Sequence, residues 1–128
     1  MLITGLVLAA VAALVHVYIF SMESFAWTTQ QARSVFGTTP EEAEATQELA
    51  FNQGFYNLFL GVVAGIGIVL TATGQATAGL ALVYAGAGSM AAAAAVLFLS
   101  SPDKRSAAVK QGFVPLLAVV LLLVAQTV

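Results

Sequence analysis

Residues 2–22 read LITGLVLAAVAALVHVYIFSM, a stretch without Asp, Glu, Lys or Arg. A helix needs about 20 consecutive apolar residues to cross the hydrocarbon core of a bilayer. Residues 50–71, 77–99 and 109–127 are similarly apolar. The sequence therefore predicts an all-α integral membrane four-helix bundle. We expect one transmembrane domain over residues 1–128, with helices at about 2–24, 40–72, 77–100 and 102–127.

The composition supports a lipid environment and excludes several kinds of site. The chain of 128 residues is 60% hydrophobic and 8% charged, whereas soluble domains carry roughly 25% charged residues. It has no cysteine and one histidine, so disulfides, thiolate metal sites and multi-histidine metal sites within one chain are excluded. We expect no metal, no cofactor and, at a net charge of −2, no nucleic-acid partner.

The basic residues predict the orientation in the membrane. All four lie in the polar links between helices, and none lies near Met1, in the 71–76 turn or at the C-terminus: Arg33, Lys104, Arg105 and Lys110. Basic residues accumulate on the cytoplasmic side, so both chain ends are predicted to lie outside. The first stretch lacks a basic leader and a clear cleavage site, which favours a retained helix over a signal peptide.

Local motifs predict where the cytoplasmic segments become helical. Residues 28–38 are polar and are expected to form a surface loop. Residues 39–42 read T-P-E-E, a capping box with proline at the first helical position. The second helix is therefore predicted to begin near Pro40, in water, and to continue unbroken into the membrane.

The triplet Q-G-F occurs at residues 53–55 and again at 111–113, where the second and fourth helices enter the bilayer. This repetition favours two helical hairpins related by a pseudo-two-fold axis along the membrane normal; coincidence is the alternative. Gly61 and Gly65 form a G-x-x-x-G pattern that is typical of close helix packing in lipid.

Polar side chains in an apolar chain are the candidate functional residues, because burial in hydrocarbon without a partner is costly. Helical geometry places those of the first, second and fourth helices at one depth in the cytoplasmic half of the membrane. We predict that they line one ligand-binding cavity: His16, Glu23, Asn52, Gln53, Tyr56, Asn57 and Gln111.

Structural roles are the alternative for each of these residues. His16 could donate to a backbone carbonyl or to Asn57, and Glu23 could be an interfacial charge paired with Lys110. Trp27 fits the aromatic belt at the membrane surface. If the cavity is chemical, His16 is the candidate acid/base near neutral pH, and Glu23 orients it or relays protons.

Four motifs carry a resemblance to a known family. They are H-V-Y-I-F-S-M-E-S-F-A-W-T-T from residue 16, R-S-V-F-G from residue 33, N-Q-G-F-Y-N-L-F-L from residue 52 and Q-G-F-V-P-L-L from residue 111. In order and spacing they resemble the bacterial membrane proteins called the domain of unknown function 1304 family. This chain has E-S-F at residues 23–25, where that family typically has E-M-F, and Phe113 at an often small position. The resemblance implies a multi-pass protein of the bacterial inner membrane and no established activity.

Three functions remain open at this point. The leading hypothesis is the binding or transport of a small polar molecule in a cavity open to the cytoplasm, and a transporter of this size is expected to form a homodimer. The second is a membrane enzyme that uses His16 as acid/base. The third is a partner-binding scaffold, with a dry interior and the wet extension of the second helix as its contact surface.

Overall fold

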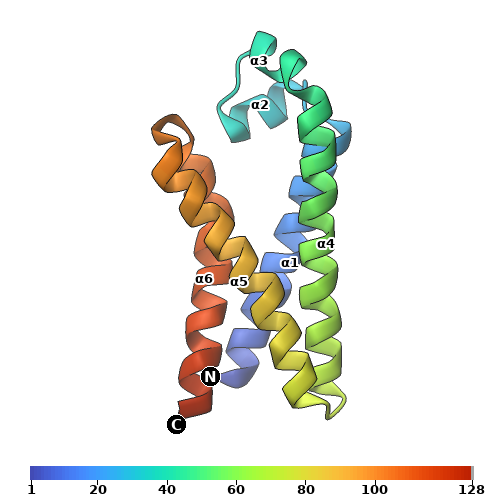
Figure 1. Ribbon diagram of the computed structural model, residues 1–128, viewed down its shortest axis with the longest axis vertical. Coiled ribbons are helices and arrows are strands. Elements are labelled where there is room, and N and C mark those ends of the chain that lie inside the picture. The colour runs from blue at the N-terminus through green and yellow to red at the C-terminus, as the bar shows by residue number, and fades with distance from the viewer. Residues whose placement is uncertain (128) are drawn as a thin grey trace.

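The computed structural model describes residues 1–127, which are mostly helical and include no strand. Four long helices form a bundle (Figure 1), which confirms the predicted fold class: α1 (Leu2–Phe25), α4 (Gln47–Ala72), α5 (Ala76–Ser100) and α6 (Arg105–Thr127). Three short helices join them: α2 (Gln30–Phe36), α3 (Pro40–Ala45) and the 3-10 helix η1 (Pro102–Lys104). Each long helix, with η1 counted into the fourth, is long and apolar enough to cross a membrane. The chain is therefore a multi-pass membrane protein.

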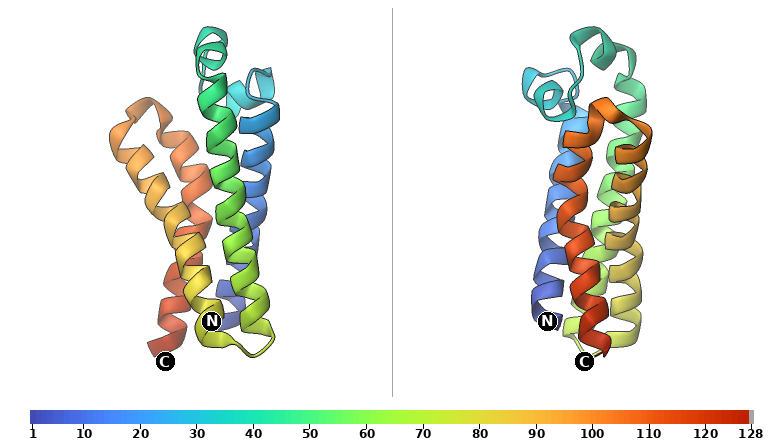
Figure 2. Two further views of the ribbon diagram at one scale, coloured as in Figure 1. Left: turned by 45° about the vertical axis from the view of Figure 1, so that its right-hand side comes forward. Right: turned by 90° about the vertical axis from the view of Figure 1, so that its left-hand side faces the viewer.

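The helices form a ring in which α1 and α5 each pack against both α4 and α6. The N-terminus, the end of α6 and the turn between α4 and α5 lie at one end of the bundle, called here the termini end (Figure 2). Helices α2, α3 and η1 lie at the opposite end, called here the link end. Figure 1 shows that the α5–α6 hairpin leans away from α1 and α4 toward the link end.

Small residues allow the helices to approach closely near the middle of the bundle. A Cβ atom on Gly86 of α5 would lie 3.0 Å from the carbonyl oxygen of Leu60 in α4. A Cβ atom on Gly61 would lie 3.1 Å from the carbonyl oxygen of Ala13 in α1, but one on Gly65 would meet no heavy atom within 4 Å. The predicted G-x-x-x-G contact is thus half right, because the buried seam of α4 continues from Gly61 to Ala64 instead.

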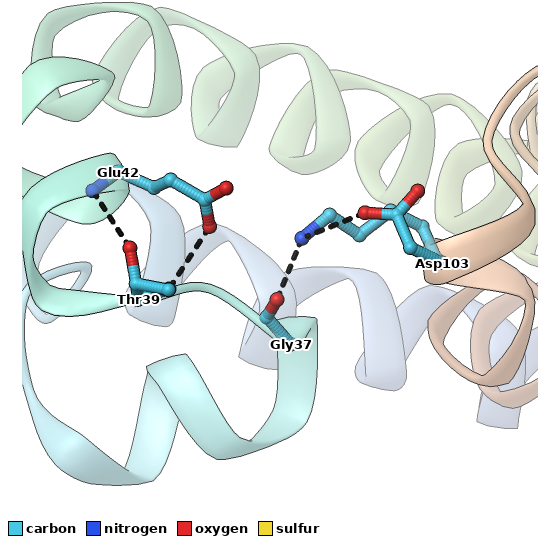
Figure 3. A network of polar contacts seen from close by, with 5 residues as sticks. Gly37, Thr39, Glu42 and Asp103 are labelled. Atoms are coloured by element: carbon cyan, nitrogen blue, oxygen red, sulfur yellow. Dashed lines mark hydrogen bonds and ion pairs between the residues drawn. The ribbon is translucent and has the colours of Figure 1, made fainter.

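The link between α1 and α4 differs from the sequence prediction in two places. Residues 28–38 are not a plain loop, since α2 begins at the Thr29 cap and ends at Gly37, whose φ of 67° suits glycine. The predicted single helix over 40–72 is interrupted at Thr46, which separates α3 from α4. The hydroxyl of Thr46 donates to the carbonyl of Glu42 at 2.6 Å and accepts from Trp27 Nε1. The predicted capping box of Thr39 and Glu42 is confirmed (Figure 3).

Candidate functional site

An open cavity of about 850 Å³ lies at the link end, where the two hairpins diverge. Side chains from all four long helices and from the α2–α3 segment line it. All seven predicted ligand-binding residues are among its lining: His16, Glu23, Asn52, Gln53, Tyr56, Asn57 and Gln111. The structure therefore brings together side chains that lie as far apart in the chain as α1 and α6.

His16 lies deepest among the polar lining residues and is only 2% exposed. Its Nδ1 atom is 2.9 Å from the carbonyl oxygen of Ala12. Because a carbonyl oxygen only accepts, Nδ1 carries the proton of the neutral ring, and Nε2 presents its lone pair. Within residues 1–127, no protein group forms a hydrogen bond with Nε2. Ala12 itself packs into an apolar core cluster with Met90, which closes the cavity toward the termini end.

Glu23 and Asn57 form a buried pair between α1 and α4. The Asn57 amide nitrogen donates to Glu23 Oε2 at 2.6 Å and to the backbone carbonyl of Gln53 at 3.3 Å. The two side chains are 8% and 7% exposed. The ion pair considered for Glu23 and Lys110 is not formed: the salt bridge found in the described part of the chain joins Lys104 to Asp103. Glu23 therefore has an amide partner and no cationic one among these residues.

Close approach of α1 and α4 beside this pair depends on Gly54. A Cβ atom at position 54 would overlap the hydroxyl of Ser24 and lie 3.0 Å from the carbonyl oxygen of Phe20. The Ser24 hydroxyl donates to the carbonyl of Phe51 at 2.9 Å and joins the two helices. Gly54 thus permits the close contact of α1 with α4. This contact buries the Glu23 carboxyl group, which accepts a hydrogen bond from Asn57.

The remaining predicted residues lie nearer the opening or on the opposite wall. Asn52 is exposed and its amide donates to the carbonyl of Glu48 one turn earlier. Tyr56 is 66% exposed. Gln111 projects from α6, four residues before Pro115. Proline has no N–H group, so the Gln111 carbonyl lacks the backbone hydrogen bond that a helix normally gives it.

Two further lining residues were not predicted as part of the site. Trp27, expected in the aromatic belt, lines the cavity and donates from its indole to Thr46 Oγ1 at 3.0 Å. Its position four residues after Glu23, just beyond the end of α1, was the available signal. Lys104 also lines the cavity and donates to the carbonyl of Gly37 at 2.7 Å (Figure 3). This contact joins the two links across 67 positions of sequence, a separation for which no local pattern exists.

The lining combines charged, aromatic and apolar groups. Glu23 and Glu42 contribute carboxylates, and Lys104 contributes the ammonium group. In residues 1–127, no group of three His, Cys, Asp or Glu side chains is arranged to hold a metal ion. The arrangement can accept hydrogen bonds at His16 and Glu23 while aromatic and aliphatic walls enclose the rest of a ligand.

The two Q-G-F triplets occupy comparable places. Gly54 is buried against α1 and Gly112 against Ala94 of α5, and the preceding glutamines, Gln53 and Gln111, both line the cavity. This placement fits the expected pair of related hairpins, and the pseudo-two-fold axis remains a prediction.

Comparison with known proteins identifies a family without a known activity. Residues 10–123 match the family model described as protein of unknown function (DUF1304). No curated protein and no solved structure matches the chain.

Proposed function

This chain belongs to the DUF1304 family of proteins of unknown function, and we propose that it binds a small polar molecule in the cavity at its link end. The observation that carries the proposal is the convergence of seven polar side chains on one cavity. Its volume of about 850 Å³ lies within the roughly 300–1,000 Å³ of ordinary ligand sites. A scaffold with a dry, packed interior fits this geometry less well.

The basic residues support an opening toward the cytoplasm. Arg33 lies in α2, Lys104 in η1, and Arg105 and Lys110 in the first turns of α6, all at the link end. By the positive-inside rule this end faces the cytoplasm and the termini face outward, across the bacterial inner membrane. The apolar core between the cavity and the termini end is consistent with an inward-open binding state. Transport would need a second conformation that opens toward the termini end. We propose that, as a transporter, the protein acts as a homodimer.

A membrane enzyme is the second candidate, and the geometry of His16 favours it. The Ala12 carbonyl fixes the tautomer and leaves Nε2 as the free base. Glu23 follows seven residues later, about 10 Å along the helix axis, and its partner is Asn57. The Ala12 carbonyl, rather than Glu23, therefore orients the imidazole in this structure.

The single tryptophan offers a direct test of ligand binding, because Trp27 lines the cavity. The full chain in dodecyl maltoside micelles is titrated with small alcohols, amides, amines and carboxylates while Trp27 emission is recorded. At least one class should give a saturable change. Ala93→Phe, at a lining position of α5, should abolish this change, whereas Ala92→Phe, at an exposed position outside the lining, should preserve it.

Absence of a saturable change with every class would contradict the binding proposal. An undiminished response in Ala93→Phe would contradict it equally, because the signal would then arise outside the cavity. His16→Gln separates the two candidate functions by the fate of the bound probe: an enzyme converts the probe chemically in the native form and not in His16→Gln, whereas a binding protein converts it in neither form.

A further inference from the structure

We propose that the ligand is a protonated organic amine whose ammonium group binds at Glu23. This proposal rests on the proposed binding function and assigns the chemical class of its ligand. It begins with the surroundings of the Glu23 carboxyl group, which the protein leaves incomplete. Oε2 accepts from Asn57, and no described residue donates to Oε1. Ionisation of a buried carboxyl group is favoured by a compensating cation and by hydrogen-bond donors, and an alkylammonium group supplies both.

The other charged groups of the cavity favour a cation over an anion. Glu42 adds a second carboxylate to the lining. The ammonium group of Lys104 is already directed to the carbonyl of Gly37, with Asp103 Oδ2 3.7 Å away. Glu42 is engaged in the same way, because its Oε2 accepts from the backbone N–H of Thr39 at 2.9 Å. The two carboxylates nevertheless outnumber the one ammonium group of the lining, so the lining repels an anionic ligand and attracts a cationic one.

The acceptors and the walls define the kind of cation. His16 Nε2 is an acceptor at the inner end of the cavity, about 10 Å from Glu23 along the helix, so hydrogen-bond donors on the ligand have two places to bind. Trp27, Phe36 and Tyr56 supply aromatic rings of the type that attract organic cations. A bare alkali ion would need a shell of oxygen ligands, whereas this cavity offers apolar walls such as Leu60 and Leu97. These features select an amine with an aliphatic or aromatic body.

The test compares probes that share a hexyl chain and differ in the head group: hexylammonium, hexanol, hexanoate and hexyltrimethylammonium, with caesium chloride as the inorganic cation. Binding to the full chain in dodecyl maltoside micelles is followed by Trp27 emission at constant ionic strength. Hexylammonium should bind about tenfold or more tightly than hexanol and hexanoate, because its hydrogen bonds are charge-assisted. It should also exceed hexyltrimethylammonium, which cannot donate, and caesium, which cannot fill the cavity.

Glu23→Gln provides the decisive variant. Its amide oxygen can still accept from Asn57, so the fold is expected to persist. The affinity for hexylammonium should fall to that of hexanol, while the affinity for hexanol stays unchanged. Glu48→Gln is the matched control, because it removes the same charge from an exposed position of α4 outside the lining. It should leave hexylammonium binding intact.

The outcomes separate this proposal from the proposed function. Equal or tighter binding of hexanol, hexanoate, hexyltrimethylammonium or caesium would overturn the assignment of a protonated amine and leave a binding protein. Unchanged hexylammonium affinity in Glu23→Gln would do the same. A lack of response to every probe would contradict both proposals. If Glu23→Gln does not fold, the ranking of the five probes on the native chain decides the question alone.

Discussion

Substituting Gly54 tests whether close contact of α1 and α4 holds the Glu23–Asn57 pair. In Gly54→Ala, the new methyl group would overlap the Ser24 hydroxyl and lie 3.0 Å from the carbonyl oxygen of Phe20. The hydroxyl can rotate away only by giving up its bond to Phe51, a loss of about 1 kcal/mol. The backbone contacts cannot rotate away, and overpacking of this kind costs about 1–3 kcal/mol. These two losses sum to about 2–4 kcal/mol of unfolding free energy, from which the reduced freedom of the unfolded chain returns up to about 1 kcal/mol.

The measurement is reversible unfolding in dodecyl maltoside micelles by added sodium dodecyl sulfate, followed by Trp27 emission and helical ellipticity. Gly65→Ala is the matched control on the same helix, since its methyl group would meet no heavy atom within 4 Å. We expect no loss there, and a gain of up to about 1 kcal/mol from the reduced freedom of the unfolded chain.

A double variant makes the prediction sharper. Ser24→Ala removes the hydroxyl overlap but leaves the contact with the Phe20 carbonyl, so Gly54→Ala should cost about 1 kcal/mol less in that background. If Gly54→Ala were as neutral as Gly65→Ala, the inferred packing of α1 on α4 would be wrong. The same conclusion would follow if Ser24→Ala gave no relief.

Three further predictions concern the cavity and its entrance. Asn57→Leu should lower the free energy of unfolding by about 1–3 kcal/mol, because Glu23 loses its donor; an unchanged value in the detergent titration would show that another donor replaces it. Lys104→Met should change stability by less than about 1 kcal/mol yet increase acrylamide quenching of Trp27, because the contact between Lys104 and the Gly37 carbonyl is lost; unaltered quenching would show that this contact does not shield the indole. Thr39→Ala should speed hydrogen exchange of the first amides of α3, since the Thr39 cap contributes about 1 kcal/mol to the stability of this helix. An unchanged exchange rate would show that packing holds α3 in place instead.

The polar residues of the site were predictable because a polar side chain in hydrocarbon is costly unless it has a partner or faces a cavity. An amide or imidazole in a spanning helix needs a partner, so His16 and Asn57 could be recognised singly. Their shared depth followed from the rise of the helix. The partner of each one could not be predicted, because it depends on how the helices are rotated against each other. Glu23 accordingly pairs with Asn57 and not with Lys110.

Other parts of the site depend on contacts that no local pattern encodes. At the break between α3 and α4, the Thr46 hydroxyl donates to the Glu42 carbonyl and accepts from the Trp27 indole. Thr46 alone resembles an ordinary residue of a continuous helix. Gly65 has the spacing of a packing motif, yet a Cβ atom there would meet no heavy atom within 4 Å. The buried face of α4 passes through Gly61 and Ala64 instead.

Hydropathy, cap residues and charge by themselves determined the four spanning helices and the start of α3 at Pro40, because these depend on the solvent and on neighbours within a turn or two. The depth of the polar side chains followed for the same reason. Only the tertiary structure decided that the two hairpins diverge at the link end, that seven polar side chains face one cavity of about 850 Å³, and that Lys104 reaches Gly37 across it. These features depend on helix rotation and tilt, which small residues such as Gly54 set through close contacts between segments distant in the chain.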